Sequence, residues 1–161
     1  MNRIGFGFDM HPFISGRPLI LGGVRIPYEM GLDGDSDADV LVHSLIDALL
    51  GAAGKGDIGR VFGVGTPEVI GIASVLLLER TMKILKDSGY QVINTDSTII
   101  AQKPKITPHI PGMIENISRI LEIPPDRINV KATTAKHLGV LGEAKAIAVQ
   151  SVVLIESIQS S

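Results

Sequence analysis

The sequence predicts an α+β domain, in which one mixed β-sheet carries helices packed on one of its faces. Three observations support this class. Strand-like and helix-like segments follow one another along the chain, and its 161 residues suit a single domain, which we take as 1–161. The last predicted strand, Lys145 to Glu156, is apolar on both faces and must be covered on both sides, by helices and by a neighbouring subunit.

The N-terminal elements follow from hydrophobic alternation and turn residues. We expect a strand over Arg3 to Asp9 and a short hairpin over 19–26 that turns at two glycines. An aspartate-rich loop then leads into a helix from about Asp39 to Ala53, with Ser36 or Asp37 as its N-cap.

The remaining elements follow the same rules. A second helix is expected over Ala73 to Ser88, and a β-branched segment predicts a strand over Val92 to Gln102. Pro111 opens a third helix, which ends before Pro124, and Ile128 to Thr134 is the next strand.

Composition excludes several functions. The net charge is −2 and aromatic residues make up 4% of the chain, which argues against a nucleic-acid surface. The absence of cysteine excludes disulfides, thiol catalysis and cysteine-ligated zinc. No signal peptide or membrane span is recognisable, so we expect a cytoplasmic protein without membrane partners. The mean hydropathy of +0.31 favours an oligomer that buries apolar surface.

Candidate metal ligands occur in two segments. Asp9 and His11 lie two residues apart near the end of a strand, so both side chains share one face and suit a divalent metal such as zinc. Asp39, His43 and Asp47 share one stripe of an otherwise apolar helix. His43 is either a third ligand, oriented by one of these aspartates, or a buried histidine that an aspartate satisfies, and the residues alone leave both interpretations open.

Two segments are candidates for phosphate binding. Thr133, Thr134 and Lys136 combine hydroxyl and ammonium groups at the end of a strand, and 102–105 is a weaker phosphate or nucleotide loop. Each pattern is also common in segments without a ligand, so neither identifies one alone.

Taken together, the ordered motifs are much more specific than any one of them. In chain order they are Gly7-Phe8-Asp9-x-His11, Leu21-Gly22-Gly23-Val24-x-Ile26-Pro27, Ser36-Asp37-Ala38-Asp39, His43-x3-Asp47-Ala48-Leu49-Leu50-Gly51-Ala52, Gly56-Asp57-Ile58-Gly59, Ile99-Ile100-Ala101-Gln102-x-Pro104-Lys105 and Asn129-Val130-Lys131-Ala132-Thr133-Thr134. From about Arg3 to Ile155 the chain resembles the 2-C-methyl-D-erythritol 2,4-cyclodiphosphate synthase family.

The resemblance implies an enzyme of the non-mevalonate isoprenoid pathway. Such an enzyme converts 4-diphosphocytidyl-2-C-methyl-D-erythritol 2-phosphate to 2-C-methyl-D-erythritol 2,4-cyclodiphosphate and releases CMP. The resemblance also implies a homotrimer, with this CDP-type substrate bound between adjacent subunits. It makes Asp9, His11 and His43 the ligands of one Zn²⁺ per active site, and it adds Mg²⁺ or Mn²⁺ as a second cation with the substrate.

The same resemblance assigns substrate contacts. It implies that the backbone around Ala101, Pro104 and Lys105 contacts cytosine. Asp57 and Gly59 would contact the ribose, and Thr133 and Thr134 would contact the phosphates. Asp9, His11, Ser36 and Phe62 complete the substrate-binding set. Thr134 and Asp35 occupy the catalytic positions.

The chain departs from the family pattern at several positions. Asp35 stands where the family has histidine, Lys136 stands where it has a metal-binding glutamate, and Val64 lies in a loop that has lost its acidic residues. Glu143 and Gln150 occupy trimer-channel positions that hold arginine and glutamate in the family. These changes predict reduced activity. The alternative is a non-catalytic homologue that binds zinc and a phosphorylated or CDP-type ligand.

Overall fold

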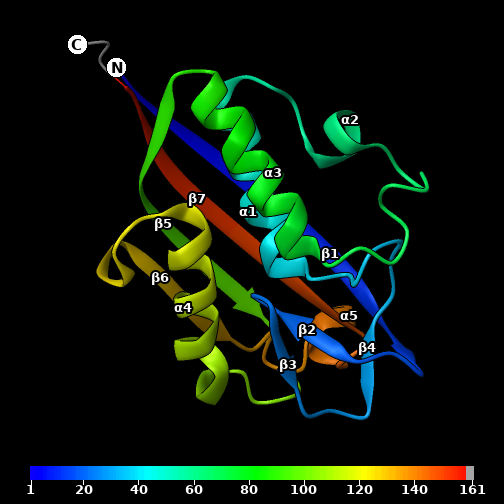
Figure 1. Cartoon of the computed structure of the whole chain (residues 1–161). Coiled ribbons are helices and arrows are strands. Elements are labelled where there is room, and N and C mark those ends of the chain that lie inside the picture. The colour runs from blue at the N-terminus through cyan, green and yellow to red at the C-terminus, as the bar shows by residue number, and fades with distance from the viewer. Residues whose placement is uncertain (159–161) are drawn as a thin grey trace.

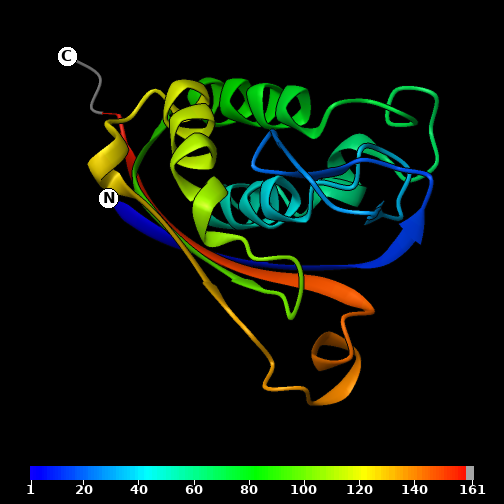
Figure 2. The ribbon, with the colours of Figure 1, turned by 90° about the horizontal axis from the view of Figure 1, so that it is seen from below.

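The computed structural model describes residues 1–158 and consists of a β-sheet with its long helices on one face (Figures 1 and 2). The strands are β1 (Asn2–Ser15), β2 (Leu19–Leu21), β3 (Val24–Ile26), β4 (Met30–Leu32), β5 (Tyr90–Ile100), β6 (Ile128–Thr133) and β7 (Ala146–Ser157). The helices are α1 (Val40–Ala53), α2 (Ile58–Phe62), α3 (Ser74–Asp87), α4 (Ile110–Leu121) and α5 (Gly139–Gly142), with 3₁₀ turns at Thr107–His109 and Pro125–Arg127.

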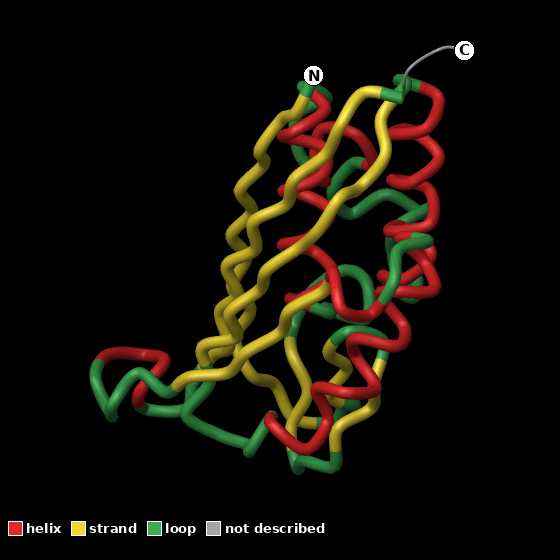
Figure 3. The backbone as a smooth tube through the Cα atoms, turned by 90° about the vertical axis from the view of Figure 1, so that its left-hand side faces the viewer, coloured by secondary structure: helices red, strands yellow, loops and turns green. Residues whose placement is uncertain are grey.

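Five strands form the main sheet, in the order β4-β1-β7-β5-β6, and β2 pairs with β3 in a separate hairpin. β5 and β6 are parallel and the other pairs are antiparallel, so the predicted mixed sheet is confirmed. Figure 3 shows the long strands on one side of the molecule and the long helices on the other, whereas the short α5 lies beyond the opposite face of the sheet (Figure 2). The predicted single helical layer is therefore confirmed as well.

β1 is longer than the predicted segment that ends at Asp9. It continues to Ser15, because residues 2–12 pair along their whole length with β7 and residues 13–15 pair with β4. Asp9 and His11 consequently lie within a long paired strand rather than at a strand end. Strand pairing on this scale holds the backbone of both residues in a fixed position.

Two glycines of β1 allow the central helix to approach the sheet. A Cβ atom on Gly5 would lie 1.8 Å from the Ala48 carbonyl oxygen, and one on Gly7 would lie 1.9 Å from the Ser44 carbonyl oxygen. No side chain fits at either position, so α1 packs directly on the β1 backbone. This close contact places His43 of α1 above the helix-facing side chains of β1.

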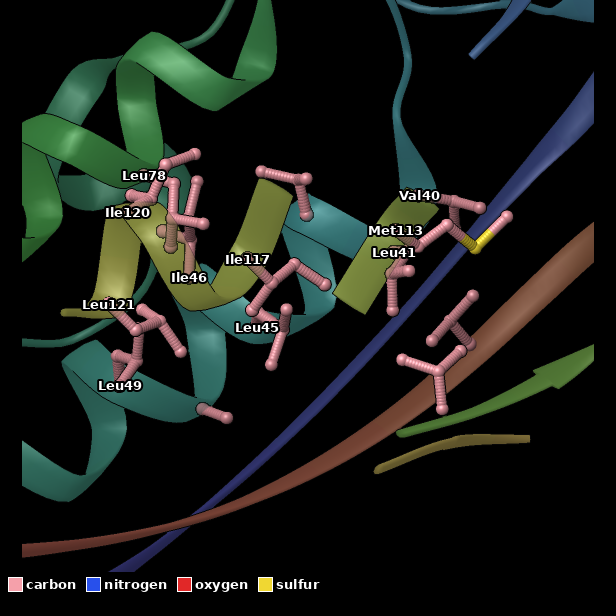
Figure 4. Packing of buried hydrophobic residues seen from close by; sticks show 14 of the residues in the cluster. Val40, Leu41, Leu45, Ile46, Leu49, Leu78, Met113, Ile117, Ile120 and Leu121 are labelled. Carbon is pink, nitrogen blue, oxygen red and sulfur yellow. The ribbon is translucent and has the colours of Figure 1, made fainter. Parts of the chain in front are cut away.

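α1 lies between the sheet and the outer helices (Figure 2). Leu45, Ile46 and Leu49 of α1 are fully buried, and Figure 4 shows them near Leu78 of α3 and Ile117 of α4. A helix covered on most sides is apolar around most of its circumference, as α1 is apart from its polar stripe with His43 and Asp47. No helix within residues 1–158 is long and apolar enough to cross a bilayer.

The predicted N-cap of α1 is wrong. Asp39, not Ser36 or Asp37, caps the helix, because its Oδ1 accepts a hydrogen bond of 3.1 Å from the Val42 amide. The same carboxylate accepts the amides of Gly22 and Gly23, at 2.9 and 2.7 Å, and so joins the β2–β3 hairpin to α1.

Candidate metal centre and substrate pockets

Three polar side chains meet where β1 lies under α1. The Asp9 Oδ2 atom is 2.8 Å from His11 Nε2 and 3.1 Å from His43 Nδ1, and the two nitrogens are 3.3 Å apart. Ligands of one tetrahedral zinc ion lie about 3.3 Å apart, given zinc–nitrogen distances of about 2.0 Å. Two imidazoles and one carboxylate form a donor set that zinc accepts, so these residues fit the predicted ion.

The outer nitrogen of each ring contacts an oxygen atom. His11 Nδ1 lies 2.6 Å from the Asp33 carbonyl oxygen, and His43 Nε2 lies 2.8 Å from Ser74 Oγ and 3.1 Å from Ser36 Oγ. When an outer nitrogen donates its hydrogen to these oxygens, the inner nitrogen keeps a lone pair for a metal. The two rings are thus oriented to offer their inner nitrogens.

Neither predicted aspartate orients His43. The Asp39 carboxylate accepts the Gly22, Gly23 and Val42 amides, and Asp47 Oδ1 accepts the Ile58 amide at 2.8 Å. Hydroxyl groups take the role instead. Ser36 was predicted to bind substrate, and Ser74 was not predicted at all, although its position at the start of a predicted helix was visible in the sequence.

The three side chains of the centre are partly buried, and their mutual contacts shift the pKa values of Asp9 and His11. Burial opposes the charged form of Asp9, but the hydrogen bonds from His11 and His43 outweigh burial and hold the pKa of Asp9 far below its usual value. Burial also lowers the pKa of His11, yet the hydrogen bond and charge of Asp9 raise it overall. A bound cation must therefore displace a proton that the site holds well.

Arg17 supports the loop that carries two of the outer oxygen atoms. Its guanidinium donates to the Gly34 carbonyl at 2.6 Å and also to the Ser36 carbonyl. The loop between Asp33 and Ser36 is thereby held against the β1–β2 turn. No sequence signal connected Arg17 to the centre, because this contact crosses a turn whose geometry the sequence does not specify.

The centre lies in the wall of a cavity of about 180 Å³. Its lining also includes Ser36, Gly59, Phe62 and Val64, and it includes Asp35, whose Oδ2 accepts the Gly65 amide at 2.8 Å. The Asp35 carboxylate thus anchors the loop that begins at Gly63. The predicted ribose contact Asp57 lies beside this cavity as the N-cap of α2, where it accepts the Arg60 amide at 2.8 Å.

A second cavity of about 370 Å³ lies at the ends of β5 and β6. It brings together the other predicted contacts, Ala101, Pro104, Lys105, Thr133 and Thr134. Within residues 1–158, the two cavities share no lining residue. The predicted substrate contacts of one chain are thus divided between two separate pockets.

This fold and this site define a class of protein: an α+β domain with a two-histidine, one-carboxylate metal centre beside a small pocket. The model of the YgbB family matches residues 2–156, and the chain belongs to that family.

Curated relatives agree over almost the whole chain. The 2-C-methyl-D-erythritol 2,4-cyclodiphosphate synthase of Nitrosomonas europaea is 55% identical over 95% of this chain and 94% of its own length. The synthase of the same name from Clostridium beijerinckii is 54% identical over 97% of this chain and 99% of its own length.

Solved structures agree as well. The bifunctional IspDF of Campylobacter jejuni superposes with a TM-score of 0.93 at 42% identity over 99% of this chain, which spans 43% of that longer protein. The CDP complex of IspF from Plasmodium falciparum has a TM-score of 0.86 at 35% identity, over 98% of this chain and 97% of its own.

Proposed function

We propose that the chain is a metal-dependent cyclodiphosphate synthase, a phosphorus–oxygen lyase of isoprenoid biosynthesis. Its substrate would be 4-diphosphocytidyl-2-C-methyl-D-erythritol 2-phosphate, and its products 2-C-methyl-D-erythritol 2,4-cyclodiphosphate and CMP. The observation that carries this proposal is the convergence of Asp9, His11 and His43 at one cavity, in a chain whose relatives bear the synthase name. The proposal places the reaction in the cytoplasm.

The proposed resident ion is one Zn²⁺ per active site, held by Asp9, His11 and His43. Three protein ligands leave a fourth position open, which is the pattern of catalytic zinc. When bound, the ion would polarise a phosphate oxygen and offset its negative charge. A second divalent ion, Mg²⁺ or Mn²⁺, is proposed to enter with the diphosphate of the substrate.

The proposed reaction needs positioning more than proton transfer. An oxygen of the 2-phosphate attacks the β-phosphorus, and the bond from that phosphorus to the oxygen bridging toward the α-phosphate breaks. CMP leaves with the bridging oxygen, and the new phosphorus–oxygen bond closes the ring. The attacking phosphate is already anionic, so the protein needs no general base and must align the two groups in line.

The second cavity is the proposed nucleotide pocket. The Ala101, Pro104 and Lys105 backbone would contact cytosine, and the Thr133 and Thr134 hydroxyls would contact phosphate. The presence of all five residues in one cavity supports this assignment. Lys105 lines this cavity and the Lys136 amide donates to Thr134 Oγ1 at 3.4 Å, so both lysines would help to offset the charge of the diphosphate.

The proposed active form is a homotrimer with active sites between subunits. The face of the sheet opposite the helices supports this, because it exposes apolar side chains on β1 and β7: Ile4 by 73%, Phe6 by 60%, Phe8 by 49%, Met10 by 46% and Val152 by 43%. The segment with α5 projects beyond this same face (Figure 2). A patch of this kind marks a protein–protein contact, and the metal cavity of one subunit would then meet the nucleotide pocket of the next.

The direct test is CMP release from the named substrate by zinc-loaded protein in excess Mg²⁺. We expect CMP and cyclic diphosphate in equal amounts, and no release after chelation. The non-catalytic alternative, motivated by Asp35 and Lys136, predicts zinc and CDP binding without product. That result with a folded, zinc-containing protein would overturn the proposed reaction and leave the binding function.

A further inference from the structure

A buried hydroxyl–carboxylate pair, Ser74 and Asp37, supports His43 from the side opposite the proposed metal. Ser74 is fully buried at the first turn of α3, and its Oγ lies 2.8 Å from His43 Nε2. The same Oγ donates to Asp37 Oδ1 at 2.5 Å, and the Ser74 amide donates to Asp37 Oδ2 at 3.1 Å. Asp37 therefore holds both the backbone and the hydroxyl of Ser74.

The hydrogen count of this chain of contacts fixes the tautomer of His43. A carboxylate only accepts hydrogen bonds, and a serine hydroxyl has one hydrogen to give. Since that hydrogen goes to Asp37, Ser74 Oγ can only accept from His43, and the hydrogen of the imidazole must sit on Nε2. A metal that displaces the hydrogen between Nδ1 and Asp9 would therefore meet the lone pair of the ring on Nδ1, the nitrogen that faces Asp9 and His11.

The nearby Ser36 hydroxyl does not fix the tautomer by itself. Its Oγ is 3.1 Å from His43 Nε2, and it also accepts the Ala38 amide at 3.2 Å and lies 3.2 Å from Ser74 Oγ. These contacts do not tie its hydroxyl hydrogen to a carboxylate, so that hydrogen can turn toward the ring. The Asp37–Ser74 pair, by contrast, directs an accepting oxygen at Nε2.

We propose that Ser74 and Asp37 are positioning residues of the metal centre, which commit the Nδ1 atom of His43 to the metal through the Ser74 hydroxyl. The inference rests on the metal site of the proposed function. It adds a carboxylate–hydroxyl–imidazole chain that makes Nδ1 a better ligand, because an outer acceptor raises the basicity of a ligating histidine. It also couples the first turn of α3 to the metal centre on α1.

The test compares Ser74→Ala with Ser88→Ala in the full chain. Ser88→Ala is a matched control, because Ser88 Oγ donates to the Ile84 carbonyl at 2.7 Å at the other end of α3. Zinc affinity is measured by competition with a chromophoric chelator. We expect Ser74→Ala to bind zinc about 10-fold to 100-fold more weakly, Ser88→Ala to match the parent, and Ser74→Thr to recover most of the affinity by restoring the hydroxyl.

A second measurement needs no variant. The ¹⁵N chemical shifts of the His43 ring in the zinc-loaded parent should show a protonated Nε2 and a metal-bound Nδ1. Equal zinc affinity of Ser74→Ala and the parent, or zinc bound through Nε2, would overturn the positioning role while leaving the metal site intact. A parent chain that binds no zinc would overturn the positioning role and the proposed metal site together.

Discussion

The chemistry of the centre depends on one carboxylate oxygen. Asp9 Oδ2 lies within 3.1 Å of a nitrogen from both His11 and His43, so it links a strand to a helix from a distant part of the sequence. In the structure these three side chains contact one another directly. A divalent cation would displace the shared protons and bind the same three atoms as ligands.

The first residue-scale prediction concerns His43→Ala. Removing the imidazole takes away one of three ligands, so we expect zinc bound to the purified protein to fall from one equivalent per chain to a small fraction. His109→Ala is the matched control, because His109 lies outside the ligand cluster. The measurement is elemental analysis after gel filtration, and one retained equivalent of zinc in His43→Ala would contradict the ligand assignment.

The second residue-scale prediction concerns pH. The contact with Asp9 raises the pKa of His11 in the folded chain. The contact therefore stabilises the zinc-free fold fully when the pH is below the ordinary pKa of histidine, and this stabilisation is lost as the pH rises through the raised pKa. We expect the urea concentration at the unfolding midpoint of the zinc-free protein to decrease as the pH is raised from about 6 to about 8. With zinc the trend should reverse, because protons compete with the metal.

Two variants serve as controls for this pH test. In the zinc-free protein, His11→Gln should make the urea midpoint less dependent on pH, whereas His109→Ala should leave its pH dependence unchanged. A zinc-free parent whose urea midpoint rises steadily from about pH 6 to about pH 8 would show that the Asp9–His11 contact does not control stability in this range.

At the scale of elements, the site exists because α1 packs directly on β1. Gly5 and Gly7 leave no room for side chains under α1, and this contact brings His43 down to Asp9. The hairpin reaches the same region through the Asp39 carboxylate. The distances among Asp9, His11 and His43 are therefore set by backbone-to-backbone packing rather than by flexible side chains.

The element-scale prediction compares Gly7→Ala with Gly51→Ala. A Cβ added at Gly7 would meet a backbone oxygen 1.9 Å away, so we expect a loss of about 3 kcal/mol or more in the free energy of unfolding. At the exposed Gly51 of α1 a Cβ has no neighbour within 4 Å, and alanine should add up to about 1 kcal/mol. Chemical denaturation measures both, and equal stabilities would refute the close contact.

Hydrophobic periodicity predicted the long elements well. The segments expected at 39–53, 73–88 and 128–134 match α1, α3 and β6 to within a residue or two at each end. Short elements were missed, namely β4, α2 and α5. The three-residue strands β2 and β3 were predicted because two glycines mark their turn, but without such a signal a segment of three to five residues carries too little periodicity to be recognised, and tertiary pairing decides whether it forms.

The site was predictable where it follows from local spacing. Asp9 and His11 were placed on one face by strand alternation, and His43 by its position on a polar stripe. The surrounding polar groups were harder to predict. The only sequence signal for Asp39 was its place on a polar helix stripe, yet it caps α1, and Ser74 reaches His43 across 31 residues of sequence. Which oxygen meets which ring nitrogen is decided by tertiary packing, which spacing does not encode.

At the scale of the whole molecule, the two faces of the sheet differ. One face is covered by α1, α3 and α4, and the other exposes the apolar row of β1 that begins at Ile4. The row lies on the opposite side of β1 from Asp9 and His11, because successive residues of a strand alternate. Assembly through this face would leave the metal ligands on the helix side.

The prediction at this scale concerns Phe6→Asp. A carboxylate forced into an apolar contact costs about 2 kcal/mol or more per subunit, so we expect the variant to sediment as a monomer and to lose CMP release. Leu76→Asp is the matched control, because Leu76 is also apolar and 44% exposed but lies on α3 in the helical layer. Analytical ultracentrifugation decides, and a trimeric Phe6→Asp protein would contradict assembly through this face.

The proposed reaction depends on a zinc ion held by Asp9, His11 and His43. The most direct measurement is a titration of chelated protein with zinc, in constant Mg²⁺, while CMP release is followed. We expect a rate that rises linearly to one zinc per chain and then stays level, and no rise for His43→Ala. Full CMP release by the zinc-free parent, or a rate that zinc does not change, would contradict it.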